Sequence, residues 1–154
     1  MNQTGKTIQF YRATGKYGFL SNLYPCEVVI ERRFSSAEHA YQYAKPMEQK
    51  VRDWIAIAPY PRLAAQIAHN LSSYDILAYW NDIKVARMRL VLRTKFDQHY
   101  GLRLRLLDLS DAVLMEASKT DAFWGIGKNG KGQNTLGMLL MELRDELKKE
   151  ANEE

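Results

Sequence analysis

A stripe of leucines near the C-terminus is the feature that most constrains the fold. Leucines recur at positions 136, 139, 140, 143 and 147, and charged residues fill most of the positions between them. Steps of three and four residues place these leucines on one face of a helix, and such a helix is stable only when that face is packed. Asn134 is a favourable N-cap for it, and the charged tail over 149–154 is expected to fray.

The rest of the chain reads as a mixture of short strands and helices. β-branched and aromatic residues predict strands over 7–12 and 26–32, and a short strand over 112–116. Helices are predicted over 35–49, 51–58, 61–70, 80–96 and 102–109. This mixture predicts an α+β fold, in which a single compact, mainly helical domain with a small β-sheet spans residues 1–148.

Composition places this domain in a broad class. The chain has 154 residues, of which 46% are hydrophobic, so one packed domain is expected. No apolar run is long enough to cross a bilayer, the N-terminus lacks a signal segment, and a single cysteine allows no internal disulfide. We therefore expect a cytoplasmic protein with no membrane partner. The net charge of +4 weakly favours phosphorylated or nucleic-acid ligands.

The stretch DAFWGIGKNGKGQN, residues 121–134, resembles two phosphate-binding motifs without matching either. The dinucleotide motif needs a strand before the glycines and a second strand after them, and the P-loop needs Ser or Thr where Gly132 stands. Two readings stay open. The glycines, with the first N–H groups of the following helix and the flat ring of Trp124, could hold a ligand. Alternatively, the stretch is a surface turn that caps the helix.

Glu38, Gln42 and Lys45 are separated by four and three residues, so they share one face of the predicted helix. A carboxylate, an amide and an amine placed together could support acid–base or nucleophilic chemistry. The alternative is that Glu38 completes a capping box with Ser35 and pairs with a neighbouring amide, while Lys45 is solvated.

The other polar residues are less specific. The three histidines lie far apart and Cys26 has no neighbouring cysteine, so no metal site is predicted. Glu116 and Asp121 precede the glycine stretch and are either surface charges or catalytic carboxylates. The arginines at 87, 89, 93, 103 and 105 form either a solvated helix face or a phosphate-contacting patch.

Six segments occur in an order that resembles the NADAR, or YbiA-like, family of N-glycosidases. They are GFLSN (18–22), SSAEHAYQYAK (35–45), W-x-x-x-K-V-x-x-M (80–88), TKF (94–96), LMEASKTDAFWGIGKNGKGQNTLG (114–137) and LLMELRDEL (139–147). The resemblance covers nearly the whole chain. Its most specific parts are E-H-x-Y-Q-x-x-K and E-x-S-x-x-D-x-F-W-G-x-G taken together.

The resemblance implies a compact α+β domain that cleaves an N-glycosidic bond at ribose C1. The implied substrates are phosphorylated ribosyl compounds: amino-pyrimidine intermediates of riboflavin synthesis, or ADP-ribose attached to guanine as a nucleotide or in nucleic acid. No metal or redox cofactor is implied. The chain departs from the family pattern in two places, where Ala68-His69 replaces a Gly-Arg pair and where Pro46 follows Lys45.

Matched position by position, the resemblance implies that Lys45 and Glu38 lie on the active-site helix and that Glu116 and Asp121 lie in the second motif. We expect Lys45 to attack C1 as a Schiff-base nucleophile, with the three carboxylates positioning groups and moving protons; a plain oxocarbenium route is the alternative. The residues expected to bind substrate are Phe19, Asn22, Gln42, Trp80, Trp124, Gly125, Gly127 and Asn134.

Two readings without catalysis remain as alternatives. The arginines and aromatic residues could form a nucleic-acid-binding module that has no turnover. The chain could also be a non-catalytic relative that binds ADP-ribose.

Overall fold

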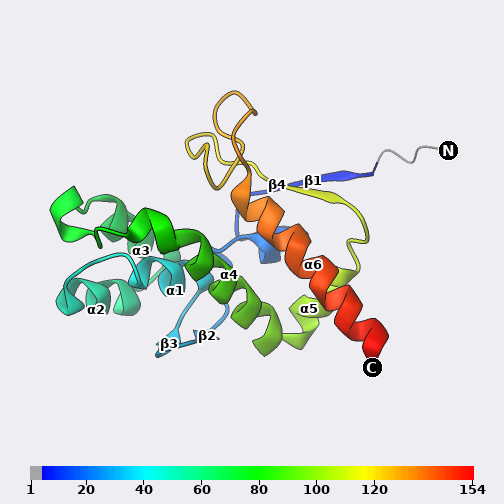
Figure 1. The fold of residues 1–154 in the computed structure, drawn as a ribbon, viewed down its shortest axis with the longest axis horizontal. Helices are drawn as coiled ribbons and strands as arrows, with labels where there is room; N and C mark the ends of the chain where they lie inside the picture. The colour runs from blue at the N-terminus through cyan, green and yellow to red at the C-terminus, as the bar shows by residue number, and fades with distance from the viewer. Residues whose placement is uncertain (1–4) are drawn as a thin grey trace. The chain divides into compact units, whose positions relative to one another are not determined.

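The computed structural model describes residues 5–154, and helices dominate it (Figure 1). The chain divides into two compact units: a terminal unit formed by residues up to 21 together with 99–154, and a central unit formed by residues 22–98. The strands form two small two-stranded sheets, which confirms the α+β class. No helix in the described range combines the length and the apolar character that crossing a bilayer requires.

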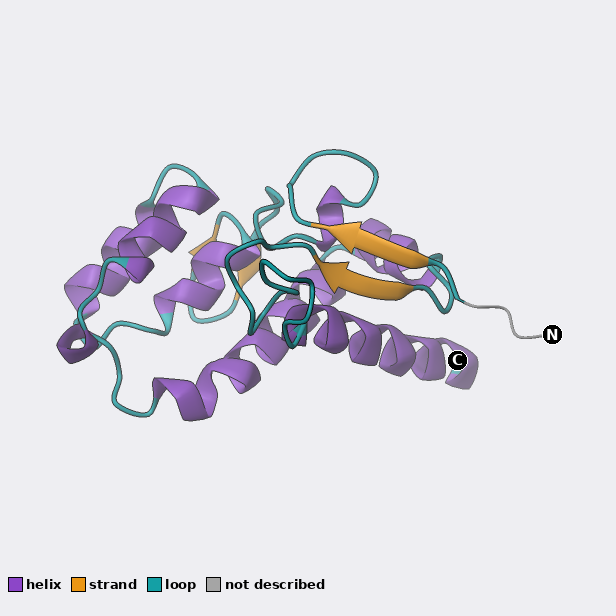
Figure 2. Ribbon diagram, turned by 90° about the horizontal axis from the view of Figure 1, so that it is seen from above, coloured by secondary structure: helices purple, strands orange, loops and turns teal. Residues whose placement is uncertain are grey.

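The terminal unit is organised around a parallel strand pair drawn from opposite ends of the chain. Strand β1 (Thr7–Phe10) pairs with β4 (Val113–Glu116), and Figure 2 shows the two arrows side by side and pointing the same way. Ile8 and Phe10 turn to the buried side of this pair while Thr7 and Gln9 are exposed. The unit also contains η1 (Gly18–Leu20), α5 (Tyr100–Leu107) and α6 (Thr135–Glu153).

Helix α6 confirms the leucine-stripe prediction, because all five leucines are buried. Asn134 stands at the N-cap position as predicted, but its side chain makes no capping bond and its φ of 52° is left-handed. Buried Arg144 donates from Nη1 to Ala112 O at 2.8 Å, which ties the helix to the start of β4. The helix runs through Glu153, so the tail that was expected to fray is helical.

The central unit joins a β-hairpin to four α-helices. Strands β2 (Val28–Val29) and β3 (Arg33–Phe34) are antiparallel, so the predicted strand over 26–32 is a short hairpin. The helices are α1 (Ala37–Tyr43), α2 (Gln49–Ile57), α3 (Pro61–His69) and α4 (Trp80–Gln98), with the turn η2 (Ser73–Asp75) before α4. Helices α2, α3 and α4 agree closely with the predicted ranges.

Helix α1 differs from its prediction at both ends. Its N-cap is Ser36, whose Oγ accepts from His39 N at 3.2 Å, so the capping box expected at Ser35 is wrong by one residue. The helix ends at Tyr43 rather than near residue 49. Pro46 explains the early end, because proline lacks an N–H and disfavours helical geometry at the residue before it.

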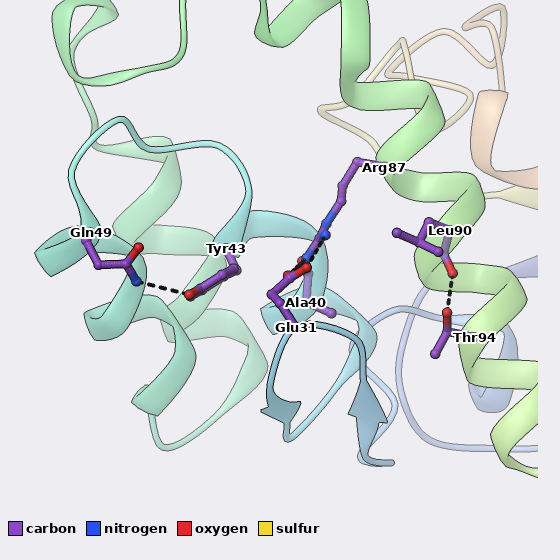
Figure 3. Close-up of polar contacts among 7 residues, drawn as sticks. All are labelled: Glu31, Ala40, Tyr43, Gln49, Arg87, Leu90 and Thr94. Carbon is purple, nitrogen blue, oxygen red and sulfur yellow. Dashed lines mark hydrogen bonds and ion pairs between the residues drawn. The ribbon is translucent and has the colours of Figure 1, made fainter.

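Helix α4 is fastened to the rest of the central unit by Arg87. Its Nε donates to Ala40 O at 3.1 Å, and its guanidinium also pairs with the Glu31 carboxylate (Figure 3). The Arg87 side chain is only 10% exposed, so these bonds lie largely out of water. Burial strengthens the attraction between charged groups, and this contact therefore holds α4 against α1.

Helix α4 also buries a cation. Lys95 of the TKF segment is fully buried, and its Nζ lies 5.6 Å from the centroid of Tyr24 and 5.4 Å from that of Phe96. Burial lowers the pKa of Lys95 to about 8, although nearby Cys26 opposes the shift. The faces of aromatic rings attract an ammonium group, and this attraction replaces part of the hydration that the Lys95 ammonium loses on burial.

Candidate active site

Helix α1 presents the first group of candidate residues. Gln42 Nε2 donates to Glu38 Oε1 at 2.8 Å, one helical turn apart, which confirms that the two side chains share a face. The alternative for Glu38 is confirmed in one part, because its carboxylate pairs with a neighbouring amide, and wrong in another, because the N-cap is Ser36 and not Ser35. The Glu38 backbone N donates to Asn22 O at 3.0 Å, so the loop carrying Asn22 lies at the start of α1.

Asn22 and Gln42 both offer acceptor oxygens in a buried setting. Only 5% of Asn22 and 4% of Gln42 is exposed. Asn22 Nδ2 donates to Met88 Sδ at 3.2 Å, and Gln42 Nε2 is fixed by Glu38, so each amide has a defined orientation. Within residues 5–154, neither Asn22 Oδ1 nor Gln42 Oε1 has a hydrogen-bond partner. Buried acceptors of this kind call for a donor from outside the chain.

Lys45 lies just beyond the end of α1, where the chain changes direction. Its N–H still donates to Gln42 O at 3.1 Å, while its carbonyl accepts from Leu77 N at 3.1 Å. Pro46 forms an isolated antiparallel bridge with Ile76. Pro46, which departs from the family pattern, thus follows the end of the helix and forms a β-bridge. The Lys45 backbone is hydrogen-bonded through both its N–H and its carbonyl.

The surroundings of Lys45 disfavour its charged form. Burial of the half-exposed side chain is the largest effect lowering the pKa of Lys45, and the positive charge of Lys84 lowers it further, while Glu38 raises it. A lysine nucleophile needs this depression because only the neutral amine attacks. Sequence reasoning did not single out Lys84; its signal was the W-x-x-x-K spacing, which places it one turn after Trp80 on α4.

His39, in the same motif, has a structural place. It is fully buried, its Nε2 lies 2.8 Å from Ala58 O and its Nδ1 lies 2.7 Å from Ser36 Oγ. Because a carbonyl only accepts, Nε2 carries the hydrogen and Nδ1 accepts from the serine. Burial lowers the pKa of His39, which favours the neutral ring. The hydrogen bond from Nε2 to Ala58 O links α1 to the end of α2.

The second group of candidates surrounds the end of β4 in the terminal unit. Ser118 Oγ accepts from Asp121 N at 3.0 Å, and Asp121 Oδ1 then accepts from Phe123 N at 2.9 Å and Trp124 N at 2.8 Å. This is a side-chain-built turn of the kind that Asp favours. One oxygen of Asp121 therefore shapes the loop, whatever else the carboxylate does.

Close backbone approaches explain two glycines here. A Cβ on Gly125 would lie 2.1 Å from Glu116 Oε2 and 2.8 Å from Glu116 O. A Cβ on Gly137 would lie 2.2 Å from Leu114 O. Gly125 thus lets the loop fold directly onto the Glu116 carboxylate, and Gly137 lets α6 approach β4.

Asn134 locks the loop to the strand. Its Oδ1 accepts from Glu116 N at 2.9 Å, and its Nδ2 donates to Leu114 O at 2.8 Å. Both ends of its amide are therefore engaged with the β4 backbone, in place of the helix capping expected from the sequence. The left-handed conformation of Asn134 is what turns the side chain back to the strand.

The idea that the first N–H groups of α6 face a ligand is wrong. Thr135 N donates to Phe123 O at 3.0 Å and Leu136 N donates to Trp124 O at 3.1 Å. Asn134 N likewise donates to Gly125 O at 3.0 Å. The loop carbonyls take up these donors, so the glycine stretch is a folded turn that closes on its own helix. Gly127 is buried within it, with a φ of 70° that favours glycine.

The three aromatic candidates differ in how much ring they expose. Phe19 is 2% exposed and carries the Arg105 guanidinium 4.2 Å from its ring centroid. Trp80 is 7% exposed and packs 5.4 Å from Tyr41. Trp124 is only half-buried and meets Phe123 edge-on at 4.8 Å. Of the three, Trp124 is therefore the best placed to receive a base.

The arginines mostly serve internal contacts. Arg93 pairs with Asp97 at 2.8 Å, Arg103 pairs with Glu150 at 3.2 Å, and Arg105 donates to Lys16 O at 2.9 Å. With Arg87 also engaged, four of the five are committed to groups of the chain itself. This favours the solvated or structural interpretation over a phosphate-contacting patch.

Known proteins resemble the chain over nearly its whole length. The NADAR domain model matches residues 9–148. The chain is 39% identical to N-glycosidase YbiA of Shigella sonnei, over 91% of this chain and 88% of that protein. It is 35% identical to N-glycosidase Npun_R5314 of Nostoc punctiforme, over 92% and 93%. It is also 36% identical to riboflavin biosynthesis protein VVA0006 of Vibrio vulnificus, over 94% of this chain and 39% of that protein.

A solved structure agrees with this assignment. The NMR structure of YbiA from E. coli matches with a TM-score of 0.88 at 37% identity, covering 97% of this chain and 89% of that one. Fold, sequence and domain model all point the same way, and the chain belongs to the NADAR family.

Proposed function

We propose that this chain, an N-glycosidase of the NADAR family, hydrolyses the C1–N bond of a phosphorylated ribosyl compound. The candidate substrates are a ribosylamino-pyrimidine phosphate and ADP-ribosyl-guanine, free or in nucleic acid. The relatives named N-glycosidase and riboflavin biosynthesis protein support the bond class and the first substrate. The single observation that carries the mechanism is a lysine, Lys45, whose pKa is lowered mainly by burial beside a carboxylate–amide pair.

In the proposed reaction, the ribosyl ring opens to an imine and neutral Lys45 Nζ adds to C1. The C1–N bond to the base then breaks, its electron pair and a proton going to the leaving nitrogen, and a Schiff base forms between C1 and Lys45. Water adds to this Schiff base and releases the sugar aldehyde, which returns the free amine. Glu38, whose charge acts on Lys45, is placed to carry protons in these steps.

We also propose roles for the two candidate carboxylates of the terminal unit. Glu116 has a buried oxygen, Oε2, against Gly125, and Asp121 fixes the adjacent turn. A carboxylate held out of water acts strongly on developing positive charge, and positive charge grows on C1 as the bond to the base weakens. Glu116 therefore stabilises that charge, and Asp121 positions Trp124 for the base.

Asn22 and Gln42 are assigned to the sugar. Their buried oxygens accept hydrogen bonds and have no partner within the described residues, whereas ribose hydroxyls are donors. A ribosyl ligand would therefore satisfy both amides at once. This assignment predicts that substrates lacking a ribose hydroxyl bind less well.

The test is borohydride trapping with three substrates: a ribosylamino-pyrimidine phosphate, ADP-ribosyl-guanosine nucleotide and an oligonucleotide carrying ADP-ribosyl-guanine. We expect a reduced ribosyl adduct on Lys45 by mass spectrometry, and a fall in turnover of roughly a thousandfold in Lys45→Ala. The matched control is Lys50→Ala, which removes a surface lysine that lies over the Trp54 ring of α2.

Near-normal turnover in Lys45→Ala, with no adduct in the wild type, would remove the Schiff-base step. The carboxylates would then act through an oxocarbenium route. Release of no base from any of the three substrates would instead contradict the substrate class.

A further inference from the structure

One face of α4 is directed at α1, and three of its residues make this plain. Trp80 lies against Tyr41 of α1, with ring centroids 5.4 Å apart. Arg87 donates to Ala40 O of α1 at 3.1 Å. Met88 Sδ accepts from Asn22, the residue whose carbonyl receives the N–H of Glu38 in α1.

Lys84 lies on this same face. It follows Trp80 by four residues and precedes Arg87 and Met88 by three and four, which are the steps that bring helical residues onto one side. Contacts to α1 one turn before and one turn after therefore direct the intervening side chain toward α1 as well. The polar groups that α1 presents are Glu38 and Gln42, with Lys45 just beyond its end.

The charges around Lys45 agree with this geometry. Within the central unit, the charge of Lys84 disfavours the ammonium of Lys45, and the charge of Glu38 favours it. The other ionic groups near the Lys45 backbone are engaged elsewhere. Arg52 of α2 donates to Pro46 O at 2.7 Å, and the Asp75 carboxylate accepts from Ser72 Oγ at 2.7 Å.

We propose that Lys84 is a positioning residue for Lys45, because it holds a second ammonium on the α4 face that is directed at α1. The inference rests on the proposed function, since it gives Lys84 a purpose only if Lys45 attacks the sugar. Two like charges in a partly buried setting repel, and the proton leaves the group that is more strongly desolvated. A lowered pKa leaves a larger fraction of the Lys45 amine free to attack at the start of the hydrolysis.

The test separates charge from packing with two substitutions. Lys84→Gln removes the positive charge and Lys84→Arg retains it, since guanidinium remains protonated. All lysines are reductively methylated with ¹³C-formaldehyde, and the Lys45 signal is assigned as the one missing from Lys45→Arg. Its titration is then followed by NMR, while kcat is measured against pH in the unmethylated variants. Lys50→Gln serves as the control for loss of a lysine charge elsewhere in the central unit.

We expect Lys84→Gln to move the Lys45 titration to higher pH and to lower kcat at pH 7 by the same factor as the free amine, which is about tenfold for each unit by which the pKa rises. Raising the pH should restore kcat in Lys84→Gln, which damage to the fold would not allow. Lys84→Arg and Lys50→Gln should titrate as the wild type does.

An unchanged Lys45 titration in Lys84→Gln would overturn the inference, while inactivity of Lys45→Ala would leave the proposed function standing. The reverse result is distinguishable: if Lys45→Ala stays active, the nucleophile assignment falls, and the purpose given to Lys84 falls with it.

Discussion

The loop that follows β4 and the segment around α1 carry the two most specific motifs of the chain, but they are built in different ways. The loop is closed on itself by its own polar groups: the carbonyls of Phe123, Trp124 and Gly125 receive the first N–H groups of α6 and its cap, and short side chains bond to backbone groups of the loop and β4. The α1 segment is held mainly by side chains, with His39 and Arg87 bonded to main-chain carbonyls of the central unit.

The difference separates residues whose polar groups the fold itself uses from residues to which the proposed function assigns chemistry. In the loop motif, Ser118 and Asn134 form hydrogen bonds that hold one tight turn, and Gly125 allows the close approach that the turn requires. In the α1 motif, Gln42 has an amide oxygen without a hydrogen-bond partner in the described residues. Lys45 has an amine whose pKa is lowered, mainly by burial. Substitutions in the loop should therefore damage folding first, and substitutions on α1 should damage turnover first.

The largest effect should come from Gly137→Ala in α6. The new Cβ would lie 2.2 Å from Leu114 O, and the β4 backbone cannot withdraw without breaking its pairing with β1. We expect a loss of ~3 kcal/mol in the free energy of unfolding. The matched control is Gly101→Ala in α5, where nothing lies within 4 Å and alanine is the better helix former. Denaturant unfolding of both variants decides, and equal stabilities would contradict the close-approach argument.

Two substitutions at Asp121 test whether its carboxylate only holds the loop in shape or also takes part in the proposed catalysis. Asp121→Ala removes the acceptor for Phe123 N and Trp124 N, and should cost about 1–2 kcal/mol in stability as well as activity. Asp121→Asn retains an acceptor oxygen and should fold normally. Turnover of Asp121→Asn then decides: a large loss assigns its charge to catalysis, and full activity confines the residue to the turn.

Arg87 tests how far side chains hold the central unit together. Arg87→Ala removes the bonds to Ala40 O and Glu31 from a side chain that is 10% exposed, and should cost about 2 kcal/mol of stability. Arg93→Ala breaks an ion pair with Asp97 whose side chains are 35% and 40% exposed, and should cost less than about 0.5 kcal/mol. Thermal unfolding gives both values, and a reversed order would contradict the role of Arg87 as the fastening of α4.

The smallest effect concerns the pH dependence of stability through His39. Burial lowers the pKa of His39 in the folded protein, so the unfolded chain takes up the proton first, near pH 6.5. Stability from this residue is complete above that pH and falls as the pH drops through the window below it, by at most about 1.4 kcal/mol per pH unit. The variant His39→Gln should lose this pH dependence, whereas His69→Gln, at an exposed position, should keep it. The free energy of unfolding measured at several pH values tests both expectations.

Periodicity was enough to predict most helices but not how the chain closes on itself. The leucine stripe predicted α6 and the Met88-to-Phe96 spacing predicted α4, because the buried residues of each helix recur at helical spacing within one short stretch of sequence. The start and end of α1 were missed because Ser35 and Ser36 are equally good caps on paper and Pro46 competes with an apparently continuous pattern. The parallel pairing of β1 with β4 joins distant segments, and nothing in either short strand specifies its partner.

Helical spacing predicted one side-chain contact of the candidate site, and the sequence missed the others. The grouping of Glu38 with Gln42 followed from helical spacing and is confirmed. The direction of the loop amides was missed, since whether an N–H faces a ligand or a carbonyl depends on tertiary folding. The influence of Lys84 on Lys45 was missed for the same reason, because it passes between two helices far apart in the sequence.

The bridge between Pro46 and Ile76 has a consequence for how this enzyme could be retuned. The Lys45 carbonyl is tied to Leu77, so the stretch joining α3 to α4 sets the direction from which the amine leaves the main chain. Adding or deleting a residue in that connector would therefore change the direction of the Lys45 side chain without replacing any residue of the candidate site.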